Sequence, residues 1–153
     1  MFDEILGLPP HPLIVHAAVV LTPLLAVLAT VYALAPRTRR SLAWAVAGLA
    51  PIVPLSVFAA RQSGESLQAG RFSSASGEMG ELINEHAAFG TPLLFVALGL
   101  GVASAALVHV CRGDRFGRPL VTAVSGLTVI LAVVAVYYVV RAGHSGAVAV
   151  WGS

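Results

Sequence analysis

The sequence predicts an all-helical membrane protein, a bundle of four transmembrane helices made of two repeated helical hairpins. Hydrophobic residues make up 58% of the 153 residues and charged residues only 10%, which leaves too little polar surface for a water-soluble globule of this size. Four apolar runs are long enough to cross a hydrocarbon core of about 30 Å at about 1.5 Å per helical residue. Short motifs in the first half of the chain also return in the second half. We expect residues 1–153 to form a single transmembrane domain.

The four apolar runs contain no Asp, Glu, Lys or Arg. They lie at about residues 13–34, 42–60, 87–111 and 120–140. Because the bilayer core offers no water to satisfy backbone groups, each run must be a helix. We expect no cleavable signal peptide, since Asp3 and Glu4 occupy the place of a basic n-region. The first helix therefore acts as its own insertion signal.

Proline and glycine predict local features of these helices. Pro12 suits the first turn of the first helix, where its missing N–H needs no partner. Pro51 and Pro54 remove backbone donors from the middle of the second helix, so they free carbonyl groups and bend the helix. In the third helix, Gly99 and Gly101 allow a neighbouring backbone to approach closely.

The segments outside the membrane carry weaker signals. Residues 61–86 are expected to form an outer loop, in which Ser76–Glu85 has the glutamates that favour a helix start. Residues 144–152 are apolar but too short to cross the bilayer. We expect this tail to fold back against the outer face of the bundle.

The repeat is seen in two pairs of motifs. His16 is followed by two alanines and, shortly after, by Thr22-Pro23; His86 is likewise followed by two alanines and Thr91-Pro92. Arg61 and Arg141 lie at equivalent places near the ends of the second and fourth apolar runs. These repeated motifs indicate an internal repeat, in which the same helical hairpin occurs twice in the chain.

Arginine predicts the orientation, since all nine basic residues are arginine. Six of them lie in the two hairpin connections, and three lie at the opposite end with six of the seven acidic residues. The positive-inside rule then places both connections in the cytoplasm and both termini outside, in a multi-pass membrane protein. The net charge of +2 is segregated by membrane side, so it does not indicate a nucleic-acid partner.

Four of the five histidines fall at the outer end of this topology: His11, His16, His86 and His144. Ionisable side chains are costly inside a membrane bundle, so such a cluster predicts a site. Imidazole suits haem iron, copper and zinc. A b-type haem needs two imidazoles on opposite faces of its iron, which the repeat supplies as His16 and His86. Arg61 and Arg141 lie at the right depth to pair with the haem propionates.

Two other sites remain open. His11, His86 and His144 with Glu85 could form a tetrahedral copper or zinc site, and His11 with His144 could form a second ligand pair beside the haem ligands. A structural subunit whose histidines bind nothing is the third possibility. Cys111 is the only cysteine, which excludes disulfides, cysteine-ligated iron–sulfur clusters and covalent haem attachment within the chain.

We therefore expect electron transfer at the outer face of the membrane through a b-type haem, by a subunit rather than a stand-alone enzyme. The partners would be the lipid bilayer, a quinol or redox protein at the outer face, and in a homo-oligomer a second copy. No nucleophile and base pair is present to indicate hydrolytic chemistry.

With these motifs in hand, the chain resembles the bacterial four-helix membrane family known as domain of unknown function 2231. The matching motifs are His11-Pro12-Leu13-Ile14-Val15-His16, the isolated His86, and Gly143-His144-Ser145-Gly146. The family pattern has His-Phe-Pro after the second histidine and Gly-Gly after the last, where this chain has His16-Ala17-Ala18 and Gly146-Ala147. The resemblance covers essentially the whole chain. It implies a multi-pass protein of the bacterial inner membrane, often found beside redox domains such as Rieske proteins.

Overall fold

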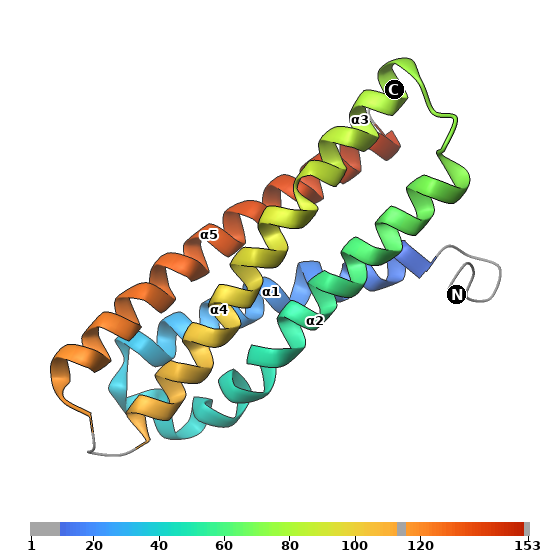
Figure 1. Ribbon diagram of the computed structural model, residues 1–153. Helices are drawn as coiled ribbons and strands as arrows, with labels where there is room; N and C mark the ends of the chain where they lie inside the picture. The colour runs from blue at the N-terminus through green and yellow to red at the C-terminus, as the bar shows by residue number, and fades with distance from the viewer. Residues whose placement is uncertain (1–9, 113–115, 152–153) are drawn as a thin grey trace.

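A computed structural model describes residues 10–112 and 116–151, and this part of the chain is helical with no strands. The long helices lie side by side in Figure 1, and the shorter helix α3 leads into α4. The helices are α1 (Pro10–Leu34), the 3-10 turn η1 (Pro36–Thr38), α2 (Arg39–Arg71), α3 (Gly77–Ala88), α4 (Gly90–Cys111) and α5 (Arg118–Trp151). Four helical segments are long and apolar enough to cross a membrane, which confirms the predicted fold class. The hairpin repeat stays a prediction.

The four long helices form a ring in the order α1, α2, α4, α5. Each packs against its two neighbours in the ring, and α1 has little contact with α4 across the centre. We call the end that holds the α1–α2 and α4–α5 connections the connection end, and the opposite end, where His11 and His86 lie, the histidine end. The helix α3 extends the histidine end and packs mainly against α5.

The surface of the bundle is apolar. Large hydrophobic side chains such as Val20, Phe95 and Ile130 are 61–68% exposed, and only 17–50% of each apolar span is buried by the other helices. Such a continuous apolar surface is unstable in water but suits contact with lipid. The interior holds small and medium side chains, with Tyr32, Leu25 and Leu100 among its largest fully buried members.

The contact between α2 and α4 depends on a glycine. A Cβ atom added to Gly101 would lie 2.4 Å from the backbone oxygen of Ala50 and 3.4 Å from the Pro54 ring. This oxygen would accept the α-helical hydrogen bond of residue 54, but Pro54 has no N–H to donate. The freed carbonyl of Ala50 therefore approaches the backbone of α4 at Gly101, where there is no side chain to block it. This is the close approach that the sequence predicted for the glycines of this helix.

The helices extend further than their apolar runs. The helix α2 continues to Arg71, past the predicted end at residue 60, and α5 continues to Trp151, past residue 140. The expected loop over 61–86 is therefore wrong, because most of this segment is helical, and so is the expected tail that folds back, because α5 continues through it. The predicted helix start near Ser76 corresponds to the start of α3. The end of an apolar run marks the end of the lipid contact. Good helix formers such as Gln62, Glu65 and Leu67 continue the helix beyond it.

The α3–α4 junction positions His86. The two helices are interrupted only at Phe89, whose N–H donates to the oxygen of His86. Pro92 has no N–H for the oxygen of Ala88, four residues earlier, so the regular helical ladder is broken here. His86 consequently lies in the last turn of α3, above the start of the membrane-spanning helix α4.

Candidate functional site: a histidine pair between the two hairpins

His11 lies in the first turns of α1 and is fixed by α2. Its Nδ1 lies 2.9 Å from the Ser63 hydroxyl oxygen. The same hydroxyl donates a hydrogen bond of 2.9 Å to the backbone oxygen of Ala60. Because the serine proton is used in that bond, Ser63 accepts from the imidazole, and His11 carries its proton on Nδ1. Nε2 then keeps its lone pair.

His86 has the same arrangement on the second hairpin. Its Nδ1 lies 3.1 Å from the Ser145 hydroxyl oxygen and 3.1 Å from the backbone oxygen of Ala142, and Ser145 itself donates to Ala142 at 3.1 Å. A carbonyl can only accept a hydrogen bond, so Nδ1 of His86 is the protonated nitrogen. Both histidines therefore have the tautomer with a free Nε2, the form that binds a metal.

A glycine lies under each imidazole. A Cβ atom added to Gly64 would lie 3.0 Å from Cε1 of His11, and one added to Gly146 would lie 3.0 Å from Cε1 of His86. Real Cβ contacts are rarely this close, so any larger residue would displace the ring. Each ring is thus seated on a helix by a serine at its edge and a glycine at its face, in the sequences Ser63-Gly64 and Ser145-Gly146.

The two rings lie beside each other in a T-shaped arrangement. Their centroids are 6.4 Å apart and their planes are nearly perpendicular, at 76°. Both side chains are partly buried. One ring is held by the α1–α2 hairpin and the other by α3 and α5, so the pair forms between two parts of the chain that are about 75 residues apart.

The structure brings His11 and His86 together and leaves two other predicted residues outside. His16 is exposed, its Nδ1 is hydrogen-bonded to the oxygen of Pro12 on its own helix, and among the described residues no contact joins it to His86. His144 is also exposed, one residue before the buried Ser145. The predicted His16–His86 pair therefore has no supporting contact, and His11 has the environment that matches that of His86.

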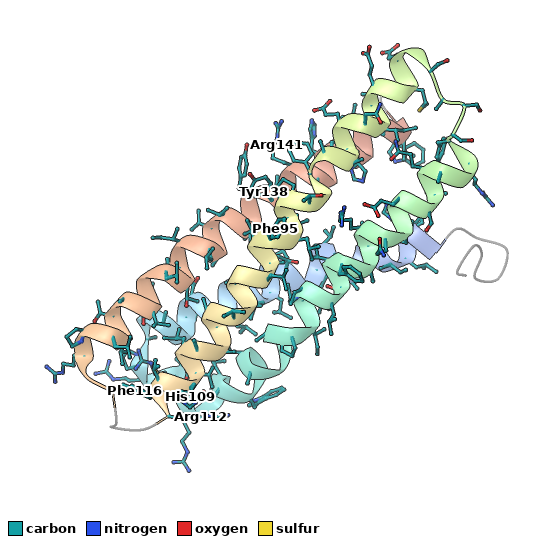
Figure 2. All side chains as sticks on the ribbon, viewed as in Figure 1. Phe95, His109, Arg112, Phe116, Tyr138 and Arg141 are labelled. Atoms are coloured by element: carbon teal, nitrogen blue, oxygen red, sulfur yellow. The ribbon has the colours of Figure 1, made fainter. Side chains whose placement is uncertain are left out.

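Arg61 and Arg141 lie on α2 and α5, close in sequence to Ser63 and Ser145, and their predicted pairing with haem propionates stays a prediction. Arg61 pairs with Glu65 at 2.8 Å and its side chain lies against Gly90. The Arg141 guanidinium lies over the Phe89 ring at 5.4 Å from its centroid, and Figure 2 shows Arg141 on the histidine-end half of α5, beyond Tyr138.

The predicted tetrahedral set is not assembled. Within residues 10–112 and 116–151 no three His, Cys, Asp or Glu side chains are close enough to hold one metal ion. Glu85 and His144 are both exposed.

The serines and glycines of the site were missed in the sequence. The signal was present, because a Ser-Gly dipeptide follows three residues after an alanine near the end of the second and of the last helix. Only the structure shows that these dipeptides seat the histidines.

These features define a four-helix membrane protein with a pair of oriented histidines between its hairpins. The sequence matches the family described as "Predicted membrane protein (DUF2231)" over residues 7–153, so the chain belongs to this family. No curated protein and no solved structure matches the chain.

Proposed function

We propose that the protein binds a b-type haem at the histidine end, with His11 and His86 as the two axial ligands, and transfers electrons there. The observation that carries this proposal is the 6.4 Å separation of the two ring centroids. Two imidazoles on opposite sides of one metal ion, each with a nitrogen at about 2 Å from it, have ring centres about 6 Å apart. The serine bonds add to this, since both rings have a free Nε2.

Haem fits the number of ligands better than a bare ion. Zinc in proteins is usually held by three or four protein ligands, whereas the described residues offer two at this place. A haem needs two from the protein, because its ring supplies the other four nitrogens. Nearly perpendicular imidazoles held at their Nδ1 atoms by hydroxyl and carbonyl oxygens are suitable axial ligands.

Each residue of the site has a distinct part in this proposal. Ser63 and Ser145 fix the ring orientation and the tautomer of the two histidines, and their hydrogen bonds tune how strongly the imidazoles donate. Arg141, which is exposed above Phe89, is available to pair with a carboxylate such as a propionate. Arg61 already pairs with Glu65, so a propionate would compete with the Glu65 carboxylate for its guanidinium. A haem bound here would supply one-electron oxidation and reduction.

The location follows from the charge distribution. All described acidic residues lie at the histidine end, on α2 and α3, and the connection end is rich in arginine. By the positive-inside rule the histidine end faces outward from a bacterial inner membrane, with both termini outside. The electron partner would then be a quinol or a redox protein at the outer face, and the protein would act as a subunit or as a homo-oligomer.

The test is an absorbance spectrum of the protein purified in detergent, compared across histidine variants. The wild-type protein is expected to show a Soret band, with sharp alpha and beta bands on reduction. His11→Ala and His86→Ala are expected to lose haem, whereas His16→Ala, which removes an exposed ring from the same helix as His11, should retain it.

The other outcomes identify other functions. Loss of haem in His16→Ala but not in His11→Ala would show that the ligand is His16. A colourless protein with stoichiometric copper or zinc would indicate a metal-binding protein, and a protein that binds neither would indicate a structural subunit. Each of these results contradicts the proposal.

A further inference from the structure

A pocket at the connection end lies between the start of α2, the end of α4 and the start of α5. Its volume is about 340 Å³, within the range of small-ligand sites. It is lined by two arginines, a threonine, a cysteine and three apolar side chains: Arg39, Arg118, Thr122, Cys111, Val110, Phe116 and Val121. The pocket lies at the opposite end of the bundle from His11 and His86.

One positive charge in the pocket is held in place. Arg39 donates from Nε to the oxygen of Tyr32 and from Nη2 to the oxygen of Ala33, both at 3.1 Å, and its guanidinium lies over the Tyr32 ring. These bonds satisfy carbonyl groups at the end of α1 that the helix itself leaves unpaired. They use two of the three guanidinium nitrogens, so the third can donate to an anion.

The second charge comes from α5. Arg118 and Thr122 are four residues apart in the first turns of this helix, so they lie on one face. Both are exposed. The positive end of the helix dipole adds to the attraction for an anion at this place. The four glutamates of the described residues are all at the other end of the bundle.

The remaining wall is apolar. Phe116 is held against His109 of α4, with ring centroids 5.8 Å apart, and Figure 2 shows both at the connection end beside Arg112. Val121, which is half-buried, and Val110, which is buried, complete the apolar wall. A free phosphate would use only the arginines. A lipid would use both parts, with its phosphate on the arginines and the start of its acyl chains against the apolar side of the pocket.

We propose that this pocket binds the anionic phosphate headgroup of a membrane lipid. Basic pockets between transmembrane helices are suited to such headgroups, and arginine binds phosphate through two parallel hydrogen bonds. This inference does not depend on what the histidine pair binds.

The test measures lipid retained by the purified full chain. Delipidated protein is mixed with phosphatidylglycerol, phosphatidylcholine or inorganic phosphate, and bound ligand is counted by native mass spectrometry. The variants are Arg118→Gln and Thr122→Val, and the control is Arg40→Gln, which removes an exposed charge at the same end but does not line the pocket. Arg39 is left intact because it also caps α1.

The wild-type protein is expected to retain phosphatidylglycerol and to release phosphatidylcholine. Arg118→Gln should bind phosphatidylglycerol about tenfold more weakly, the change expected from losing one charge-assisted hydrogen bond, and Thr122→Val should weaken it less. Arg40→Gln should bind as the wild type does. Equal losses in Arg118→Gln and Arg40→Gln would reduce the effect to general charge attraction and overturn the proposal. Equal retention of the two lipids, or binding of inorganic phosphate as tight as that of phosphatidylglycerol, would overturn it as well.

Discussion

Replacing Gly146 by alanine tests the histidine site without removing an imidazole or a charge. The added Cβ would lie 3.0 Å from Cε1 and 3.2 Å from Nδ1 of His86, where ordinary contacts begin at 3.4 Å. The ring must therefore retreat by about 0.4 Å or more. Metal–ligand distances tolerate about 0.2 Å, and His86 would also move relative to Ser145 and Ala142. We expect haem affinity to fall by about 10- to 100-fold, as when a partner of a metal ligand is removed.

The assay is haem titration followed by the Soret absorbance, together with thermal unfolding in detergent. Gly143→Ala is the matched control, because a Cβ at this exposed position of the same helix meets nothing within 4 Å. Alanine stabilises an exposed helix by about 0.8–1 kcal/mol relative to glycine, so this control should bind haem normally and unfold at a higher temperature. In Gly146→Ala the same gain is offset by overpacking that costs about 1–3 kcal/mol.

Gly64 on the other hairpin provides a second comparison. Gly64→Ala brings a Cβ to 3.0 Å from Cε1 of His11, while Gly70→Ala on the same helix meets nothing within 4 Å. Gly64→Ala should therefore lose haem as Gly146→Ala does, and Gly70→Ala should retain it. If both variants bound haem as tightly as their controls and gained the same stability, the imidazoles would not be seated on these glycines, and the assignment of the site would be refuted.

Two other substitutions probe the serine support and the helix packing. Ser145→Ala removes the hydroxyl that accepts from His86, so haem affinity should fall by about 10-fold or more, whereas Ser66→Ala, at an exposed position of α2, should leave the titration unchanged. An unaltered titration in the first variant would exclude a role for the hydroxyl. Gly101→Ala places a Cβ 2.4 Å from a backbone oxygen of α2 and should destabilise the bundle by about 1–3 kcal/mol. Gly48→Ala should not destabilise the bundle, because there is open space around this glycine. Equal unfolding temperatures for the two glycine variants would contradict the close contact between α2 and α4.

The sequence was sufficient for the number of spans and for features set by backbone chemistry. Charge-free apolar runs have few alternatives to transmembrane helices. The freed carbonyl next to Pro54 and the small Gly101 were each predicted separately, and the structure shows that they meet. These predictions succeed because each depends on a local property of one segment.

The choice between His11 and His16 could not be made in the same way. The two are five residues apart, about 500° around a helix, so only one can face a given neighbour. A helix that is apolar on all sides has no polar face to show which side points into the bundle. The motif shared by His16 and His86 favoured His16. The packing of α1 against Ser63 and Gly64 of α2 instead places His11 beside His86.

The helix ends were predicted too short for a related reason. Hydropathy reports where a chain leaves lipid, while a helix ends where its backbone bonds end. The polar residues of α2 between Arg61 and Arg71 keep those bonds, so the outer segment becomes a continuation of the bundle.

The length of α2 has a consequence for the accessibility of the site. From Arg39 to Ser63 the helix rises about 36 Å, which exceeds the hydrocarbon thickness of about 30 Å and falls within the roughly 40–45 Å that includes the lipid headgroups. In the proposed orientation, with Arg39 at the inner edge of the hydrocarbon, the imidazoles lie at the level of the lipid phosphates, where water-borne reactants arrive by diffusion. A soluble reductant that cannot permeate the bilayer should therefore reduce the proposed haem from one side of a sealed vesicle and be inert from the other.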